Sequence, residues 1–288
     1  MKLSARKLLP AVALLGLSVP AQAAPALWEV RDGDSSIWLF GSFHIVQHGT
    51  EWRTLLFDDI LTDADQVVFE TDIRPAAVAQ MTAEAFVRGV YTDGTMLTDI
   101  LDDELANELR LHAASYALPP GMLMAMRPWM ATNTISVAAL ADAGFSEQGV
   151  EFTLQPELDA SRIGFLETGE QQLDVLAGAP EDEQIAMLRA TLDQLDDLPK
   201  LMDKMMMSWT SGTPEHLAKM FLMEMGGFEE AFMDRLIYDR NHNWIPPLKT
   251  MLANNEKNIV IVGAAHLVGA NSVVDLLERA GYAVKRIQ

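Results

Sequence analysis

The stretch Asn258-Ile259-Val260-Ile261-Val262-Gly263-Ala264-Ala265-His266 decides the fold that we predict for this chain. Its run of β-branched apolar residues, which ends at Gly263, predicts a strand buried on both faces. A helical pattern over residues 271–280 and a second strand over residues 282–287 complete a predicted β-α-β unit. His266 follows the carboxyl end of the first strand, and open α/β sheets bind their ligands at that end.

A second copy of this pattern lies near the front of the chain, in Ile37-Trp38-Leu39-Phe40-Gly41-Ser42-Phe43-His44. Here too an apolar strand runs into Gly-x-x-His. Gly41 and Gly263 suit this place, because a residue without a Cβ lets the chain turn off the strand and lets the backbone approach a site closely. One such motif is a weak signal, but two at predicted strand ends indicate a shared site.

The first 23 residues have the features of a secretory signal peptide. Lys2, Arg6 and Lys7 form a basic start, residues 8–19 an apolar core, and Ala21-Gln22-Ala23 a cleavage site of small residues. The apolar core is too short for a spanning helix, so we expect no stable membrane insertion after cleavage. We expect cleavage after Ala23 and a periplasmic or secreted protein.

Charge and cysteine content exclude several classes of function. The chain has 41 acidic and 21 basic residues, a net charge of −20, and such a surface repels nucleic acid. It contains no Cys, which excludes disulfides, thiolate metal sites and cysteine nucleophiles. The length suits one large α/β domain with an insertion.

The remaining patterns predict how this domain is organised. Two apolar runs around Asp32-Gly33 predict a β-hairpin, and residues 66–70 and 162–167 predict two further strands that each end in Glu. Between and after these strands the patterns are helical. We therefore predict an α/β fold whose central mixed sheet carries a large all-helical insertion. The α/β core is assigned to residues 24–74, 161–168 and 256–288, and the helical insertion to residues 75–160 and 169–255. We expect the part of the insertion over residues 75–144 to cover the carboxyl end of the sheet as a cap.

Four predicted strands end at or near His44, Glu70, Glu167 and His266. If these strands share one parallel sheet, the four side chains converge at its carboxyl end. Imidazole and carboxylate groups together form a common ligand set for a divalent metal and also a working acid/base set. A single His or Glu at a strand end is more often a loop or capping residue, so the hypothesis rests on the set.

Arg240-Asn241 precedes the last predicted helix and is a further candidate. Arg240 could hold a substrate carboxylate or stabilise an oxyanion. An ion pair at a helix boundary is the simpler interpretation.

The ordered set of motifs resembles the TraB/PrgY/GumN family, specifically its exported GumN-like branch. The motifs that carry the resemblance are Gly41-Ser42-Phe43-His44, Glu70, Pro128-Trp129, Gly149-Val150-Glu151, Leu166-Glu167-Thr168 with Gln171, Arg240-Asn241 and Gly263-Ala264-Ala265-His266-Leu267-Val268-Gly269. The family is related to the Tiki proteins, which are regarded as metal-dependent proteases, and more distantly to erythromycin esterases and a haem-binding lipoprotein family.

The resemblance implies roles for particular residues. His44, Glu70 and His266 are implied as metal ligands, and Arg240 and Asn241 are the next candidate site residues. Glu151 stands where the family often has Asp. The Glu keeps the negative charge but has a longer side chain.

From this set we expect a divalent-metal-dependent hydrolase, a peptidase acting on exported peptides or proteins. A metal would polarise the carbonyl and activate water, Glu70 or Glu167 would accept the proton, and Arg240 would stabilise the oxyanion. The alternatives are a haem- or metal-binding protein without catalysis, and a regulator that sequesters a secreted peptide. The sequence indicates neither which metal is bound nor how many copies of the chain assemble.

Overall fold

The computed structural model describes residues 23–224 and 230–288. Of residues 222–224 it describes the backbone alone. The predicted signal peptide therefore lies outside the described residues, apart from Ala23. In the part of the chain that is described, no helix is both long and apolar enough to cross a membrane.

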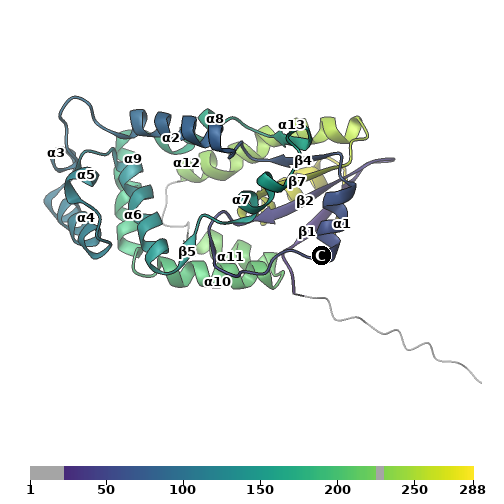
Figure 1. The fold of residues 1–288 in the computed structure, drawn as a ribbon, viewed down its shortest axis with the longest axis horizontal. Coiled ribbons are helices and arrows are strands. Elements are labelled where there is room, and N and C mark those ends of the chain that lie inside the picture. The colour runs from purple at the N-terminus through teal and green to yellow at the C-terminus, as the bar shows by residue number, and fades with distance from the viewer. Residues whose placement is uncertain (1–22, 225–229) are drawn as a thin grey trace, which may run out of the picture.

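A six-stranded mixed sheet forms the centre of the molecule, with the strand order β6-β4-β7-β2-β1-β8 (Figure 1). Strands β6, β4, β7 and β2 run parallel, β1 runs antiparallel to β2, and β8 runs antiparallel to β1. This confirms the predicted α/β class. The strands are β1 (Leu27–Arg31), β2 (Ser36–Ser42), β4 (Gln66–Phe69), β6 (Ile163–Phe165), β7 (Asn258–Gly263) and β8 (Ala283–Arg286).

Strand β7 is buried on both faces, as its sequence predicts. Ile259 and Ile261 pack in the hydrophobic core on one face of the sheet, and Val260 and Val262 pack in the core on the other. All four side chains are at most 1% exposed. A strand between two layers needs apolar side chains at every position, which explains why the run shows no alternation.

The predicted hairpin forms between β1 and β2, with Leu27 opposite Phe40 and Arg31 opposite Ser36. Its turn is closed by the side chain of Asp32, which accepts a hydrogen bond from the backbone N–H of Ser35 at 2.9 Å. An Asx turn of this kind is a common reason for Asp at this place.

The predicted β-α-β unit is present, and its two strands run in the same direction without pairing. Strand β7 is followed by α14 (Val273–Arg279) and β8, yet β8 pairs with β1 at the edge of the sheet. Both edges of β7 are already occupied, by β2 on one side and β4 on the other. The chain therefore crosses over two strands before it pairs again.

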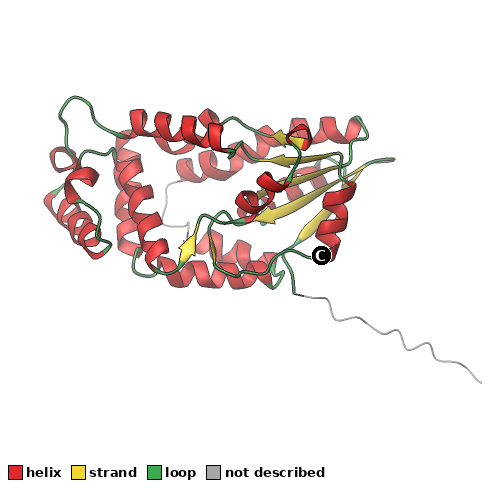
Figure 2. Cartoon of the chain, viewed as in Figure 1, coloured by secondary structure: helices red, strands yellow, loops and turns green. Residues whose placement is uncertain are grey.

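All six strands of the sheet come from residues 24–74, 161–168 and 256–288, and the stretches between them are almost entirely helical (Figure 2). Outside the sheet, the two-residue strand β3 (Val46–Gln47) pairs with β5 (Phe145–Ser146), which lies in the first part of the insertion. The helices are α1 (Leu55–Asp63), α2 (Pro75–Gly89), α3 (Leu97–Ile100), α4 (Asp103–Ser115), α5 (Pro120–Met124), α6 (Pro128–Asp142), α7 (Val150–Leu154), α8 (Gly169–Ala177), α9 (Glu181–Gln194), α10 (Leu198–Thr210), α11 (Pro214–Glu224), α12 (Glu230–Met233), the π-helical turn Asp234–Tyr238 and α13 (Asp239–Ala253).

Two helices of the insertion begin with polar caps. Asp102 caps α4 through the N–H of Leu105, and Thr168 with Gln171 forms a complete capping box at the start of α8. These caps fix where each helix begins, and the cap at α8 starts that helix directly behind Glu167.

The far helices have a core of their own. Leu105, Leu109, Leu123, Ile135 and Leu188 belong to a buried cluster that is separate from the two cores against the sheet. In Figure 1 these helices, α3 to α6 with α9, lie beyond the ends of the parallel strands. They extend the molecule on the carboxyl side of the sheet.

Candidate functional site

Four parallel strands deliver their following residues to one end of the sheet. His44, Glu70, Glu167 and His266 come after β2, β4, β6 and β7, which are neighbours in the sheet. The ladder between β4 and β6 continues past both strands, because the N–H of Glu167 donates to the carbonyl oxygen of Glu70 at 2.9 Å. The convergence that the sequence predicts is therefore present.

The two Gly-x-x-His glycines lie in tight surroundings. A Cβ on Gly41 would lie 3.1 Å from the Cα of Ala264, so the two loops pack backbone to backbone. A Cβ on Gly263 would lie 3.3 Å from Glu70 Oε1, 3.5 Å from His266 Cδ2 and 3.7 Å from His44 Nε2. The missing side chain of Gly263 thus leaves a small space that the three predicted metal ligands surround.

The motif Gly149-Val150-Glu151 brings Glu151 to His44. The N–H of Gly149 donates to the carbonyl oxygen of His44 at 3.0 Å, and the N–H of Val150 donates to that of Phe43 at 3.1 Å. A Cβ on Gly149 would lie 2.1 Å from the carbonyl oxygen of Phe43, which only glycine avoids. Helix α7 is therefore docked against the histidine loop.

Glu151 forms an ion pair with His44, Oε2 to Nδ1 at 3.1 Å, and its other oxygen accepts a hydrogen bond from the hydroxyl of Ser42. The charge of Glu151 raises the pKa of His44 to about 9. Because Nδ1 faces Glu151, Nε2 is the nitrogen that His44 presents to the space beside Gly263. Ser42 is 2% exposed, and its hydroxyl donates a hydrogen bond to Glu151. Ser42 therefore supports Glu151 rather than acting as a nucleophile.

His266 is held as a neutral ring in one tautomer. The amide nitrogen of Asn241 donates to the carbonyl oxygen of Asn271 at 2.9 Å, so its oxygen faces His266 Nδ1, at 2.7 Å. Nδ1 therefore carries the proton and Nε2 carries the lone pair, which faces Arg240 Nη1 at 3.1 Å. Burial, and next the positive charge of Arg240, lower the pKa of His266 to about 3.

Glu70 is the buried carboxylate at the centre of the site, with 4% of its surface exposed. One oxygen accepts from the N–H of Gly263 at 2.6 Å, and the other from Arg240 Nη2 at 2.5 Å and Gln172 Nε2 at 3.1 Å. Burial alone would raise the pKa of Glu70, but the positive charges of Arg240 and protonated His44 and the hydrogen bond from the N–H of Gly263 lower it to about 2. Glu70 is therefore ionised and a weak base at neutral pH.

Arg240 uses all of its hydrogen-bond donors inside the site. Nε and Nη2 donate to the two oxygens of Glu167, at 3.1 and 2.6 Å, and Nη2 also donates to Glu70. Nη1 donates to the carbonyl oxygen of Leu236 at 3.1 Å and to His266. Five N–H groups are the full complement of a guanidinium, so none is left over. Leu236 lies in the π-helical turn before α13, and such turns are frequent at functional sites.

A cavity of about 390 Å³ opens onto these groups. His44, Glu70, Arg240 and His266 line one side of it. The other side is apolar and is formed by residues that include Phe43, Val175, Met205, Leu217, Phe221 and Ile237. A largely apolar cavity with a few convergent polar groups is the usual form of a small-molecule or side-chain binding site.

The walls of this cavity correct one expectation about the insertion. They come from α8, α10, α11 and the π-helical turn, and none of the described lining residues belongs to residues 75–144. The expected cap is therefore supplied by the second part of the insertion. The first part places most of its buried apolar side chains in the separate core that it shares with α9.

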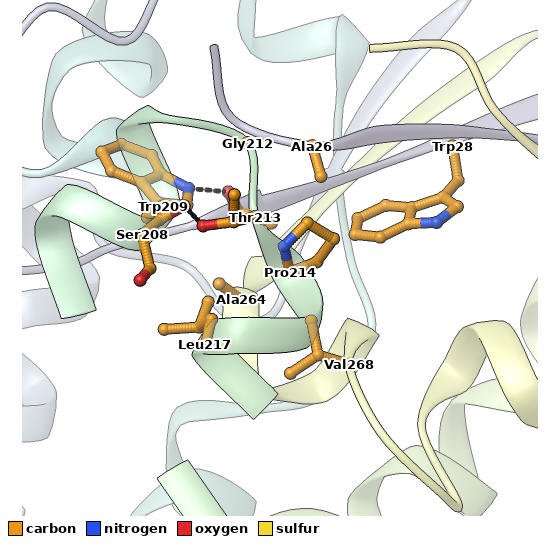
Figure 3. Close-up of a pocket in the computed structure, with 11 residues that line it drawn as sticks. Ala26, Trp28, Ser208, Trp209, Gly212, Thr213, Pro214, Leu217, Ala264 and Val268 are labelled. Atoms are coloured by element: carbon orange, nitrogen blue, oxygen red, sulfur yellow. Dashed lines mark hydrogen bonds between the residues drawn. The ribbon is translucent and has the colours of Figure 1, made fainter. Parts of the chain in front are cut away.

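A second, much smaller cavity lies next to Gly41 and shows how the wall is anchored (Figure 3). Its volume of about 10 Å³ leaves room for roughly one water, so it is no substrate site. Trp209 of α10 donates from Nε1 to the carbonyl oxygen of Gly41 at 2.7 Å. This bond ties the helix that carries Met205 to the end of β2.

The site includes residues that the sequence does not single out. Ser42 supports Glu151, Gln172 supports Glu70, and the ring of Trp244 lies 4.5 Å from that of His266 and 4.9 Å from the guanidinium carbon of Arg240. Trp244 follows Arg240 by four residues on α13, so helical spacing could have pointed to it. No comparable signal marks Gln172, which reaches Glu70 through the packing of α8.

In this arrangement the predicted ligand set does not fit a metal ion. The donor types are suitable and they surround one space, but the lone pair of His266 Nε2 already faces a guanidinium. Among the described residues, no group of three or more His, Asp or Glu side chains is placed to hold a metal. Metal binding by His44, Glu70 and His266 stays a prediction, and it requires Arg240 to move away from His266.

Comparison with known proteins agrees with the motif pattern. The model of the TraB/PrgY/gumN family matches residues 26–286, which is nearly the whole chain. No curated protein and no solved structure gives a significant match. The match includes both Gly-x-x-His motifs and every residue of the site described above. The chain belongs to the TraB/PrgY/gumN family.

Proposed function

We propose that this protein is a hydrolase that cleaves peptide bonds in exported peptides or proteins, with His44 as the group that transfers protons. The observation that carries the proposal is the Glu151–His44 ion pair at 3.1 Å, with the other ring nitrogen directed toward the space beside Gly263. A histidine oriented by a buried carboxylate at the rim of a cavity is a recurrent arrangement for general base and acid catalysis.

Water is the nucleophile that these residues favour. The chain has no Cys, and the hydroxyl of Ser42 is engaged with Glu151. His44 Nε2 would take a proton from water as it attacks the carbonyl carbon. The resulting imidazolium, stabilised by Glu151, would return the proton to the leaving amine. Glu70 is too weak a base to compete for that proton, because its pKa is lowered to about 2.

The role of Arg240 follows from its contacts. Since all five of its N–H groups have partners, it does not hold an oxyanion directly in this arrangement. Its positive charge is already balanced by Glu70 and Glu167, so its part is to hold these carboxylates and His266 in position.

Removing the charge of Glu151 should shift the pH dependence of activity to lower pH. With the pKa of His44 raised to about 9 by Glu151, the neutral, proton-accepting ring predominates only above that pH. In wild type kcat/KM should therefore rise with pH through this range. In Glu151→Gln the pKa of His44 falls toward its ordinary 6.5, and the rise should move with it. The measurement is kcat/KM for both proteins across the neutral and alkaline range.

Glu157→Gln is the matched control, because Glu157 follows α7 but pairs with Arg53 at the surface. Its profile should coincide with that of wild type. A rise at the same pH in wild type and Glu151→Gln would contradict the role of the ion pair.

The apolar wall supports a preference for an apolar side chain next to the cleaved bond. Met205 and Met207 lie on the same helix, but Met205 lines the cavity and Met207 is 62% exposed. Met205→Glu places a charge against the substrate and should lower kcat/KM for an apolar substrate by about 10- to 200-fold, the range set by apolar pocket contacts. Met207→Glu should leave it unchanged. If both substitutions lower kcat/KM equally, the proposed preference for an apolar substrate side chain is contradicted.

A further inference from the structure

The guanidinium of Arg240 occupies the place in this site where a metal cation would be expected. It lies 3.1 Å from His266 Nε2, 2.5 Å from a carboxylate oxygen of Glu70 and 2.6 Å from one of Glu167. These are the same donor types that bind divalent metals. Arg240 therefore already neutralises the negative charge of these carboxylates and donates hydrogen bonds to the same atoms that would bind a metal.

Burial of its ion pairs opposes displacement of Arg240 by a metal. Arg240 is 9% exposed, and the side chains of Glu70 and Glu167 are 5% and 7% exposed, so the ion pairs are shielded from water. A metal that bound His266 Nε2 would have to take a lone pair that a guanidinium N–H now uses. That would leave two buried carboxylates without part of their pairing, and it would set a divalent charge beside a monovalent one.

We infer that Arg240 stands in for a metal: the native site binds no divalent ion, and removal of the guanidinium opens a metal site formed by His44, Glu70 and His266. Glu70 Oε1 and His266 Nε2 are 3.8 Å apart. Two ligands of one ion lie roughly 3.0–3.5 Å apart, so a small shift of either side chain would complete the site. His44 Nε2 borders the same space beside Gly263. The inference concerns the same site as the proposed hydrolase but is decided by metal binding, not by cleavage.

The experiment measures Zn²⁺ binding by purified, EDTA-treated protein. Wild type should bind less than one equivalent in calorimetry, and Zn²⁺ should leave its Tm unchanged. Arg240→Met should bind about one equivalent, and its Tm should rise with Zn²⁺ concentration, as expected when a ligand binds only the folded state. Adding His266→Ala to Arg240→Met should abolish both effects. Arg189→Met, which removes an exposed guanidinium, should behave as wild type.

Two results would overturn the inference. One is stoichiometric Zn²⁺ binding by wild type that is lost in His44→Ala or His266→Ala. The other is a folded Arg240→Met that gains no site. If Arg240→Met does not fold, Arg240→Met combined with Glu167→Gln removes one of the two unpaired charges and takes its place, with the same expectation.

Cleavage assays on the same samples separate this inference from the proposed function. Cleavage by wild type that EDTA abolishes and Zn²⁺ restores would overturn the inference and leave the hydrolase standing. If no sample cleaves a peptide and wild type binds no metal, the proposed hydrolase is overturned and the inference about Arg240 stands.

Discussion

Replacing His44 with glutamine should lower kcat/KM by about 10²- to 10⁴-fold, the usual contribution of a general base or acid. The side chain of His44 is 56% exposed, so little packing is lost. Glutamine keeps an N–H that can reach Glu151, which prevents that buried carboxylate from losing its partner. The measurement is steady-state cleavage of a peptide substrate, with the melting temperature recorded for both proteins.

His48→Gln provides the control for this substitution. His48 lies four residues further along and is exposed to solvent, so its replacement should leave kcat/KM unchanged. A His44→Gln enzyme that retains activity within a few-fold of wild type would contradict the role assigned to His44.

Replacing Arg240 with methionine should have the largest effect on stability. It leaves Glu70 and Glu167 buried without their cation, and breaking a buried pair in this way costs about 3–5 kcal/mol. The surface substitution Arg189→Met breaks a pair whose side chains are 40% and 57% exposed, and should cost about 0–1 kcal/mol. Urea unfolding of both variants measures the difference, and equal losses would contradict the importance of the buried cluster.

The loss in Arg240→Met should depend on pH. In wild type the pKa of Glu70 is lowered from 4.5 to about 2, so its contribution is present above the higher value and disappears as pH falls through the lower one. Without Arg240 that pKa rises and protonation relieves the unpaired charge. The difference between wild type and variant should therefore be largest near neutral pH and shrink in acid.

The sequence predicts the positions of four site residues because parallel strands carry their carboxyl ends to one edge. An apolar run followed by a polar residue is a local pattern, and His44, Glu70, Glu167 and His266 each follow such a run. The pattern also shows that each of these polar residues follows the carboxyl end of its strand. Once the four strands are neighbours, their convergence follows.

The partners of these residues depend on packing between distant segments, which no local pattern encodes. Glu151 reaches His44 because Gly149 fits against the backbone of residues 43 and 44, more than 100 positions away in the chain. The cavity wall depends in the same way on Trp209 holding α10 against Gly41. The pairing of β8 with β1 depends on packing too, since the sequence does not tell which strand edge is free.

The most direct test of the central claim is digestion of a peptide library by purified protein that lacks residues 1–23, with cleavage sites mapped by mass spectrometry. Wild type, treated with EDTA and free of added metal, should cleave next to apolar residues, and His44→Gln should not. Cleavage by His44→Gln at the rate of wild type, or no cleavage by wild type with or without divalent metal, would contradict a hydrolytic site built around His44.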